Sequence, residues 1–137
     1  MRFLTCLILL SGCLVILALR ARAAPSGWED FRSRCCRAGA RSDALVGSFL
    51  NQHAGPLIEE DKVVFLYWDR NASRVEIGGD FTGWSRWEPA HRLSKSSLFY
   101  VELRGLPASA RLEYRFRVDG REVVDPRNPN RVNNGVG

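Results

Sequence analysis

The feature that most constrains this chain is a run of strict alternation near its C-terminal end. From Arg111 to Val118 (RLEYRFRV), charged and apolar residues alternate at every position. Successive side chains of a β-strand point to opposite faces, so this run predicts a strand with one face toward a core. Asp119-Gly120 follows as a tight hairpin turn, because glycine supplies the positive φ that such turns require, and residues 121–124 return as the next strand. The inward-facing set is expected to be Leu112, Tyr114, Phe116 and Val118.

Three earlier segments also have the two-residue period of strands. Lys62–Trp68 (KVVFLYW) is apolar on both faces, residues 74–77 (RVEI) alternate, and residues 98–103 (LFYVEL) carry three large apolar side chains on one side. Turn residues separate these segments at 69–72 and 104–107. Short strands at such spacing are typical of a β-sandwich, so the expected fold class is all-β.

One short amphipathic helix is expected before the strands. Residues 42–53 begin with a Ser-Asp cap and place four apolar residues on one helical face, before Gly55-Pro56 stops the helix. The preceding residues 24–41 are polar and irregular, and we assign them no structure. Cys35-Cys36 is interpreted as an incidental pair near a mobile terminus, because adjacent cysteines close a strained ring only with difficulty. The expected organisation is a polar segment with a short helix at 24–58 and a sandwich at 59–137.

The first 23 residues have the layout of a secretory signal peptide. Arg2 precedes an uncharged run of 16 residues, Leu4–Leu19, and Ala21-Arg22-Ala23 supplies small residues ahead of a cleavage position. A basic start, an apolar middle and small residues at the cut are the signature of export. We therefore expect cleavage after Ala23 and release to the periplasm or the exterior.

Two alternatives for this leader remain open. Arg20 and Arg22, just beyond the apolar run, favour a segment retained as a membrane anchor, although 16 residues is short for a spanning helix. Leu10–Cys13 (LSGC) resembles a bacterial lipobox, which would place a lipid on Cys13. A membrane is expected as a partner only by one of these two routes.

Charge and motif content exclude several function classes. The chain has 137 residues and a net charge of +5, but three of its arginines lie in residues 1–23, so the remainder carries only +2. That balance gives little reason to expect a nucleic-acid partner. The sequence has no Gly-x-Ser-x-Gly elbow, no phosphate-binding glycine loop and no cluster of metal ligands, and His53 and His91 are interpreted as surface residues. We expect no catalysis, no cofactor and no metal.

One loop is unusual for its aromatic content. Residues 78–89 (GGDFTGWSRWEP) hold two tryptophans and a phenylalanine among glycines and small polar residues. Aromatic residues mostly belong to cores, whereas this composition belongs to an exposed loop. An exposed aromatic cluster marks a binding surface without naming its partner.

This loop is part of a longer pattern that resembles a known family. The segments VEIGGDFTGWS (75–85), LFYVELRGLP (98–107), LEYRFRVDG (112–120) and VVDPRNPN (123–130) occur in that order. Together they resemble the immunoglobulin-like early-set β-sandwich of the isoamylase N-terminal type, over roughly residues 60–134. That family includes the glycogen-binding module of the AMP-activated kinase β subunit. The resemblance implies a non-catalytic carbohydrate-binding module.

A closer likeness is to the N-terminal module of exported, enterochelin-esterase-like hydrolases. The segment GPLIEED at 55–61, the Phe-Leu-Tyr strand at 65–67 and the DPRNPN tail at 125–130 are similar to that module. The likeness implies that the chain covers the leader and the accessory module, and stops at Gly137 where a hydrolase domain would begin. It makes a hydrolase domain or subunit the alternative partner.

The resemblance to the glycogen-binding modules also implies site residues. Trp84 takes the place of a tryptophan that stacks on a glucose ring, and an aromatic plane suits the C–H face of a sugar. Arg115 takes the place of a basic residue that hydrogen-bonds sugar hydroxyls. Asn133 or Asn134 takes the place of an asparagine near the end of the domain. These residues predict an α-glucan or a related oligosaccharide as the ligand.

The family's second stacking tryptophan is replaced here. Its position is Glu122, and Trp87 substitutes for it only if the loop bends toward the same face. Phe81 and Trp84 have an alternative use, as a plug for the end of the sandwich or as the cover of an interface with a hydrolase domain. Three hypotheses therefore remain: a glucan-binding module, an esterase accessory module and a structural domain with no ligand.

Overall fold

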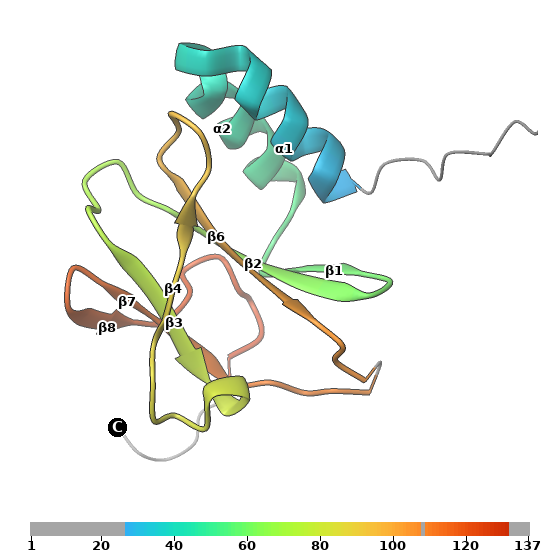
Figure 1. The fold of residues 1–137 in the computed structure, drawn as a ribbon, viewed down its shortest axis with the longest axis vertical. Helices are drawn as coiled ribbons and strands as arrows, with labels where there is room; N and C mark the ends of the chain where they lie inside the picture. Colours follow the sequence, from blue (N-terminus) through green and yellow to red (C-terminus); the bar gives the residue numbers. More distant parts are fainter. Residues whose placement is uncertain (1–26, 108, 132–137) are drawn as a thin grey trace, which may run out of the picture.

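The computed structural model describes residues 27–107 and 109–131, and it shows two β-sheets with a pair of helices on one side (Figure 1). Each sheet has four antiparallel strands, in the orders β1-β2-β6-β5 and β4-β3-β7-β8. The first sheet consists of β1 (Leu57–Glu59), β2 (Lys62–Trp68), β6 (Leu98–Arg104) and β5 (His91–Arg92). The second consists of β4 (Glu88–Pro89), β3 (Val75–Gly79), β7 (Tyr114–Val118) and β8 (Arg121–Val123). The predicted all-β sandwich is confirmed, and the predicted leader at residues 1–23 lies outside the described residues.

Strand β2 has an apolar layer on each of its faces, as predicted from its sequence. Val64 and Leu66 point toward the helices, whereas Phe65 and its half-buried neighbours Val63 and Tyr67 point toward the second sheet. The strand pairs with β6 over its whole length, from Lys62 opposite Arg104 to Trp68 opposite Leu98. Continuous apolar character is what a strand covered on both sides requires.

The core between the two sheets depends on the alternation that the sequence shows in β7. Tyr114, Phe116 and Val118 all contact this core, as expected, whereas Leu112, expected inward with them, precedes β7 and is not part of this core. The turn that follows has φ of 46° at Asp119 and 87° at Gly120, so the predicted hairpin to β8 is confirmed. The buried members of the core are Phe65, Ala72, Val75, Ile77, Phe99, Val101 and Phe116.

Two helices cover the outer face of the first sheet, where the sequence predicted one. Helix α2 (Ser42–Gln52) matches the prediction for residues 42–53. The segment left unassigned at residues 24–41 contains a second helix, α1 (Gly27–Ala38), joined to α2 by the 3₁₀ turn η1 (Gly39–Arg41). Leaving this segment unassigned was wrong, because Trp28, Phe31 and Cys35 recur at helical spacing and are all buried against the sheet.

The interpretation of the cysteine pair changes with this helix. Cys35 is fully buried in the core beneath α1, whereas Cys36 is exposed, and both are free thiols. Burial raises the pKa of the Cys35 thiol to about 11. Cys35 is therefore a packing residue of the core and not an incidental residue near a terminus.

Charged side chains fasten the start of α1 to the sheet beneath it. The backbone N–H of Trp28 donates to Glu59 Oε1 at 2.9 Å. The buried ammonium of Lys62 donates to Glu29 Oε1 at 2.8 Å and lies 3.3 Å from Glu59 Oε2. These contacts make α1 a part of the folded unit. Within residues 27–107 and 109–131, neither helix is long and apolar enough to cross a membrane.

Candidate functional site

The aromatic loop between β3 and β4 begins with a tightly closed turn, the 3₁₀ helix η2 (Asp80–Thr82). The buried hydroxyl of Thr82 donates to the carbonyl of Gly79 at 2.9 Å and accepts the N–H of the same residue at 3.0 Å. These two bonds fix the point at which the chain leaves β3. In Figure 1 the turn lies at the end of β3, far from the two helices.

The turn lies directly against the backbone that leads into β7. A Cβ atom on Gly79 would stand only 2.3 Å from the carbonyl oxygen of Glu113, so no other residue fits at this position without a shift of the backbone. The backbone N–H of Asp80 donates to that same oxygen at 3.1 Å. The close approach brings the aromatic loop next to the strand that carries Arg115.

Trp84 is held outward in a costly backbone conformation. Its φ is +56°, directly after Gly83 at +60°, and about 1–2 kcal/mol is the usual cost of the left-handed region for an L-residue with a side chain. Its N–H donates to the carbonyl of Gly79 at 3.1 Å, and its indole Nε1 donates to Asp80 Oδ1 at 2.9 Å. The side chain remains 48 % exposed. Strained backbone persists only where the surrounding structure holds it in place, and it often occurs at functional sites.

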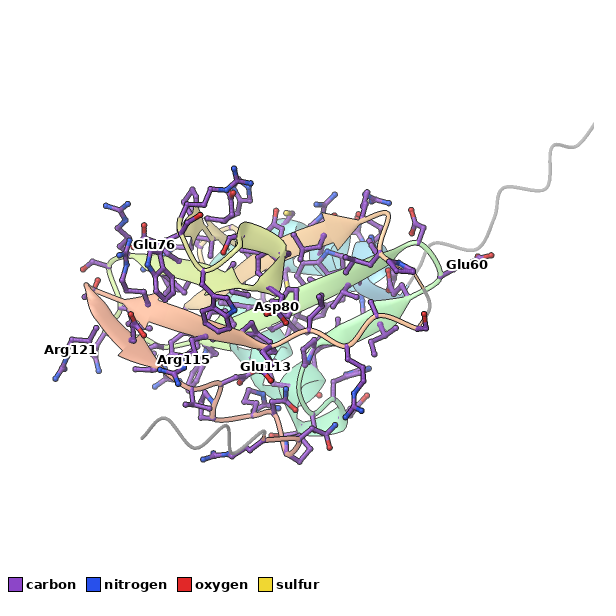
Figure 2. The ribbon with its side chains drawn as sticks, turned by 90° about the horizontal axis from the view of Figure 1, so that it is seen from below. Glu60, Glu76, Asp80, Glu113, Arg115 and Arg121 are labelled. Carbon is purple, nitrogen blue, oxygen red and sulfur yellow. The ribbon has the colours of Figure 1, made fainter. Side chains whose placement is uncertain are left out.

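A shallow groove of about 110 Å³ lies beside this indole, and it brings together two of the predicted site residues, Trp84 and Arg115. Figure 2 shows Asp80 and Glu113 close together near the middle of the view, with Arg115 to their left and Glu60 at the right-hand edge of the molecule. The groove offers apolar surface and several side chains that donate hydrogen bonds. Besides the two predicted residues, its lining includes Leu112, Val124, Asn128, Asn130 and Arg131.

Three residues that line the groove form a partly buried hydrogen-bond network, Tyr114, Asp125 and Asn128. The hydroxyl of Tyr114 donates to Asp125 Oδ2 at 2.6 Å and accepts from the side-chain amide of Asn128 at 3.1 Å. Burial, together with the hydrogen bond to Asp125, raises the pKa of Tyr114 well above its usual value. Asp125 Oδ1 accepts the backbone N–H of Arg127 at 2.9 Å. This network orders the DPRNPN tail against β7.

The same tail is tied to the helical layer. The guanidinium of Arg127 donates to the carbonyls of Leu50 and His53, at the C-terminal end of α2, with 2.9 Å to His53. The tail therefore crosses from the second sheet back to the helices and places Asn128 and Asn130 on the groove. No pattern in the sequence predicted these two asparagines as site residues, although both belong to the DPRNPN motif.

Arg115 is within reach of Glu122 on the neighbouring strand. Their side chains approach to 3.6 Å, and both are substantially exposed. The acidic residue that replaces the family's second tryptophan therefore lies next to the predicted sugar-binding arginine. An exposed pair at this distance contributes little to stability, so Arg115 remains available to a ligand.

Trp87 lies on the outer face of the second sheet and is not among the residues that line the groove. Its ring packs over Gly78, which is opposite Arg115 in the register of β3 and β7, and the guanidinium of Arg117 lies 4.6 Å from its centroid. Phe81 packs in the other direction, against Phe65 in the core, with 5.7 Å between ring centroids. The three aromatic residues of the loop thus have three different surroundings.

The predicted asparagines Asn133 and Asn134 lie outside the described residues. Within residues 27–107 and 109–131, no group of three or more histidine, cysteine or acidic side chains is arranged to hold a metal ion.

A second and larger groove, of about 560 Å³, follows the edge of β6. Its lining includes Arg86, Glu88, Tyr100 and Glu102. Strand β5 pairs with β6 only at residues 99 and 100, so in the described part of the chain the rest of this edge has no neighbouring strand.

A family model described as the glycogen recognition site of AMP-activated protein kinase matches residues 62–136, which is more than half of the chain. Among solved structures, pullulanase type I from Bacillus subtilis str. 168, complexed with maltose, is similar to this chain at 19 % identity and a TM-score of 0.36. The similarity covers 56 % of this chain and 11 % of the pullulanase chain, so the chain spans only a small part of that protein's length. No curated protein matches the sequence.

Proposed function

The chain belongs to the family of the glycogen recognition site of AMP-activated protein kinase, and from this premise we propose that it is a non-catalytic module that binds α-glucan. The ligand is a polysaccharide such as glycogen or starch, or an oligosaccharide cut from one. The groove beside Trp84 is the binding site.

The observation that carries this proposal is the exposed, immobilised indole of Trp84 next to Arg115. A pyranose ring presents a face of C–H bonds that packs on an aromatic plane in water. Around that face are hydroxyls, which accept hydrogen bonds from a guanidinium or a side-chain amide. Arg115 and Asn130 line the same groove as Trp84, and their side chains can donate such hydrogen bonds.

The surroundings of the neighbouring aromatic residues support a binding role for Trp84 over a structural one. Phe81 already fills the end of the core, and Trp87 already covers the bare backbone at Gly78. Trp84 does neither, since nearly half of its surface is open to solvent. A plug would be buried, whereas a stacking platform has to be open.

Affinity electrophoresis tests the proposal. The full chain is run through gels containing glycogen, soluble starch or no polysaccharide, with Trp84→Ala and Trp68→Ala beside it. Trp68 is the matched control, because it is also a partly exposed tryptophan, 38 % exposed, but lies at the end of β2 outside the groove. We expect retardation of the wild type and of Trp68→Ala, and free migration of Trp84→Ala. If no protein moves more slowly in the glycogen or starch gel than in the gel without polysaccharide, simple polysaccharide recognition is excluded.

The accessory role in an exported esterase is the second candidate function. The observation that favours it is the groove along β6, where an unpaired strand edge lies beside charged and aromatic side chains. An open strand edge is a surface on which a second polypeptide can pack. If the neighbouring gene sequence encodes a Gly-x-Ser-x-Gly hydrolase, the full chain should co-purify with it, and Trp84→Ala should not weaken the complex. Absence of both the gene and the complex would exclude this role.

Export is also part of the proposal, and it rests on the leader at residues 1–23. N-terminal sequencing of the protein recovered from its source cells should show a chain that begins at Ala24. A chain that still begins at Met1 would support the anchored alternative, and a lipid-modified Cys13 would support the lipoprotein alternative.

A further inference from the structure

Asp80, which no prediction from the sequence assigned a role, connects the two sides of the groove. Its Oδ1 accepts the indole N–H of Trp84 at 2.9 Å, and its Oδ2 accepts the backbone N–H of Glu113 at 2.7 Å. Its own N–H donates to the carbonyl of Glu113 at 3.1 Å. One residue therefore fastens the aromatic loop to the segment that enters β7, and Figure 2 shows Asp80 and Glu113 close to one another.

The two hydrogen bonds to the Asp80 carboxylate hold two different parts of the groove lining. The Oδ1 bond orients an indole that has little packing to hold it, since 48 % of the side chain is exposed. The Oδ2 bond fixes Glu113, two residues before Arg115 on the same segment. Hydrogen bonds to an ionised carboxylate are stronger and more directional than neutral ones. The carboxylate therefore sets the position of the aromatic plane relative to Arg115.

An immobilised ring has a consequence for affinity. A tryptophan that samples several side-chain rotamers loses that freedom when a ligand stacks on it, and the loss weakens binding. A ring already held in its binding orientation loses less. Asp80 itself does not line the groove, so this effect does not require a contact between its carboxylate and the ligand.

We propose that Asp80 is a positioning residue of the glucan site, which holds the Trp84 indole at a fixed angle to Arg115 without contacting the sugar. The inference rests on the proposed function, because it concerns the same groove. It predicts that the hydrogen bond from the Trp84 indole to this carboxylate contributes to glucan affinity and not only to folding.

A comparable carboxylate elsewhere in the same sheet provides the control. Asp119 Oδ1 accepts two backbone N–H groups, from Ser73 at 3.1 Å and Arg74 at 2.8 Å, at the β7–β8 hairpin. Asp119→Asn therefore disturbs a similar turn outside the groove, and Asp80→Asn disturbs the turn beside it. A purely structural role predicts that both substitutions lower stability and that neither acts specifically on binding.

The experiment measures the binding of maltoheptaose to the full chain by calorimetry. The proteins are the wild type, Asp80→Asn, Asp119→Asn, Trp84→Phe and the double variant Asp80→Asn/Trp84→Phe. Asparagine is neutral and has one acceptor oxygen in place of two, so the hydrogen bond from the Trp84 indole to an ionised carboxylate is either lost or replaced by a weaker neutral one. We expect Asp80→Asn to bind about ten-fold more weakly, the effect of a single hydrogen bond to a charged group. Asp119→Asn should bind like the wild type.

The double variant shows whether Asp80 acts through the indole. Phenylalanine has no N–H to donate, so in the Trp84→Phe background Asp80→Asn should change affinity by less than about two-fold. NMR supplies a second readout. The indole N–H signal of Trp84, identified by its absence in Trp84→Phe, should exchange with solvent faster in Asp80→Asn and at the wild-type rate in Asp119→Asn.

The outcomes separate this inference from the proposed function. Three results would each overturn the positioning role and leave glucan binding standing. The first is wild-type affinity in Asp80→Asn, and the second is an equal loss of affinity in Asp80→Asn and Asp119→Asn. The third is a loss of affinity on Asp80→Asn that is as large in the Trp84→Phe background as in the wild type. A wild type that does not bind maltoheptaose would overturn both the positioning role and glucan binding.

Thermal unfolding shows whether Asp80→Asn folds. If it does not fold, the test uses Trp84→Phe, which should bind maltoheptaose about ten-fold more weakly than the wild type. Wild-type affinity in that variant would overturn the inference.

Discussion

The indole nitrogen of Trp28, at the start of α1, donates a hydrogen bond to Glu102 of β6 across 2.7 Å. The same ring is fully buried and packs edge-on against Tyr100, with 5.0 Å between centroids. A contact between residues 74 positions apart in the sequence makes α1 part of the outer layer of the first sheet.

This contact predicts a large loss of stability on truncation of the indole. Trp28→Ala removes a buried aromatic side chain and should lower the free energy of unfolding by about 3–5 kcal/mol. Urea denaturation of the full chain provides the measurement, with the partly exposed Trp68→Ala as control. If the two variants unfold at the same urea concentration, α1 does not contribute to the cooperative unit.

The close approach at Gly79 makes a second prediction. Gly79→Ala forces a methyl group to 2.3 Å from the carbonyl of Glu113, so the backbone has to shift, at a cost of about 1–3 kcal/mol. The matched control is Gly47→Ala in α2, where a Cβ meets no atom within 4 Å and the change should stabilise the helix by up to about 1 kcal/mol. Thermal unfolding should move in opposite directions for the two variants. A neutral Gly79→Ala would show that the loop does not approach β7 as closely as described.

Glu76 predicts a pH dependence of stability. This buried carboxylate on β3 accepts hydrogen bonds from Arg117 Nε at 2.8 Å and from Arg74 Nη2 at 2.7 Å. The hydrogen bond from Arg117, opposed by burial, holds the pKa of Glu76 below its usual value. A carboxylate with a lowered native pKa stabilises the fold at pH values above its unfolded pKa of about 4.3, and that contribution is lost as the pH falls through the native pKa.

Glu76→Gln should therefore be less stable than the wild type at pH 7, by about 1.5–3 kcal/mol, and the difference should shrink as the pH falls below about 4.3. Chemical denaturation at a series of pH values measures both stabilities. Glu60→Gln is the control, since Glu60 is exposed at the far edge of the molecule (Figure 2). A constant difference between Glu76→Gln and the wild type at all pH values would contradict the assignment.

The position of Glu122 predicts a gain of affinity. The family resemblance places a stacking tryptophan there, and the structure places Glu122 beside Arg115, which lines the groove. Glu122→Trp should bind maltoheptaose about three- to ten-fold more tightly than the wild type, the usual contribution of an added aromatic contact. Glu122→Ala controls for loss of the carboxylate. Equal affinity of the tryptophan and alanine variants would show that the ligand does not extend over β8.

Much of the sandwich could be predicted because most of its strands have a local sequence pattern of apolar residues. The alternation in residues 111–118 and the two apolar faces of Lys62–Trp68 each follow from the direction in which strand side chains point. Helix α1 could not be predicted with the same ease. Its polar residues outnumber Trp28, Phe31 and Cys35, and only the sheet beneath turns those three positions into a buried face. The short strands β1, β4 and β5 likewise depend on a partner strand more than on their own composition.

The features of the candidate site also divide into those that the sequence predicts and those that depend on the tertiary structure. The sequence by itself determined that this chain forms a β-sandwich and that a glycine-rich loop carries exposed aromatic character, because strand period and residue type are local properties. The tertiary structure alone decided that Trp84 faces the groove with Arg115, that Trp87 lies on the sheet outside it, and that Asn128 arrives from a tail folded back onto β7. These relationships join residues far apart along the chain, and they exist only where packing and hydrogen bonds bring the backbone segments together.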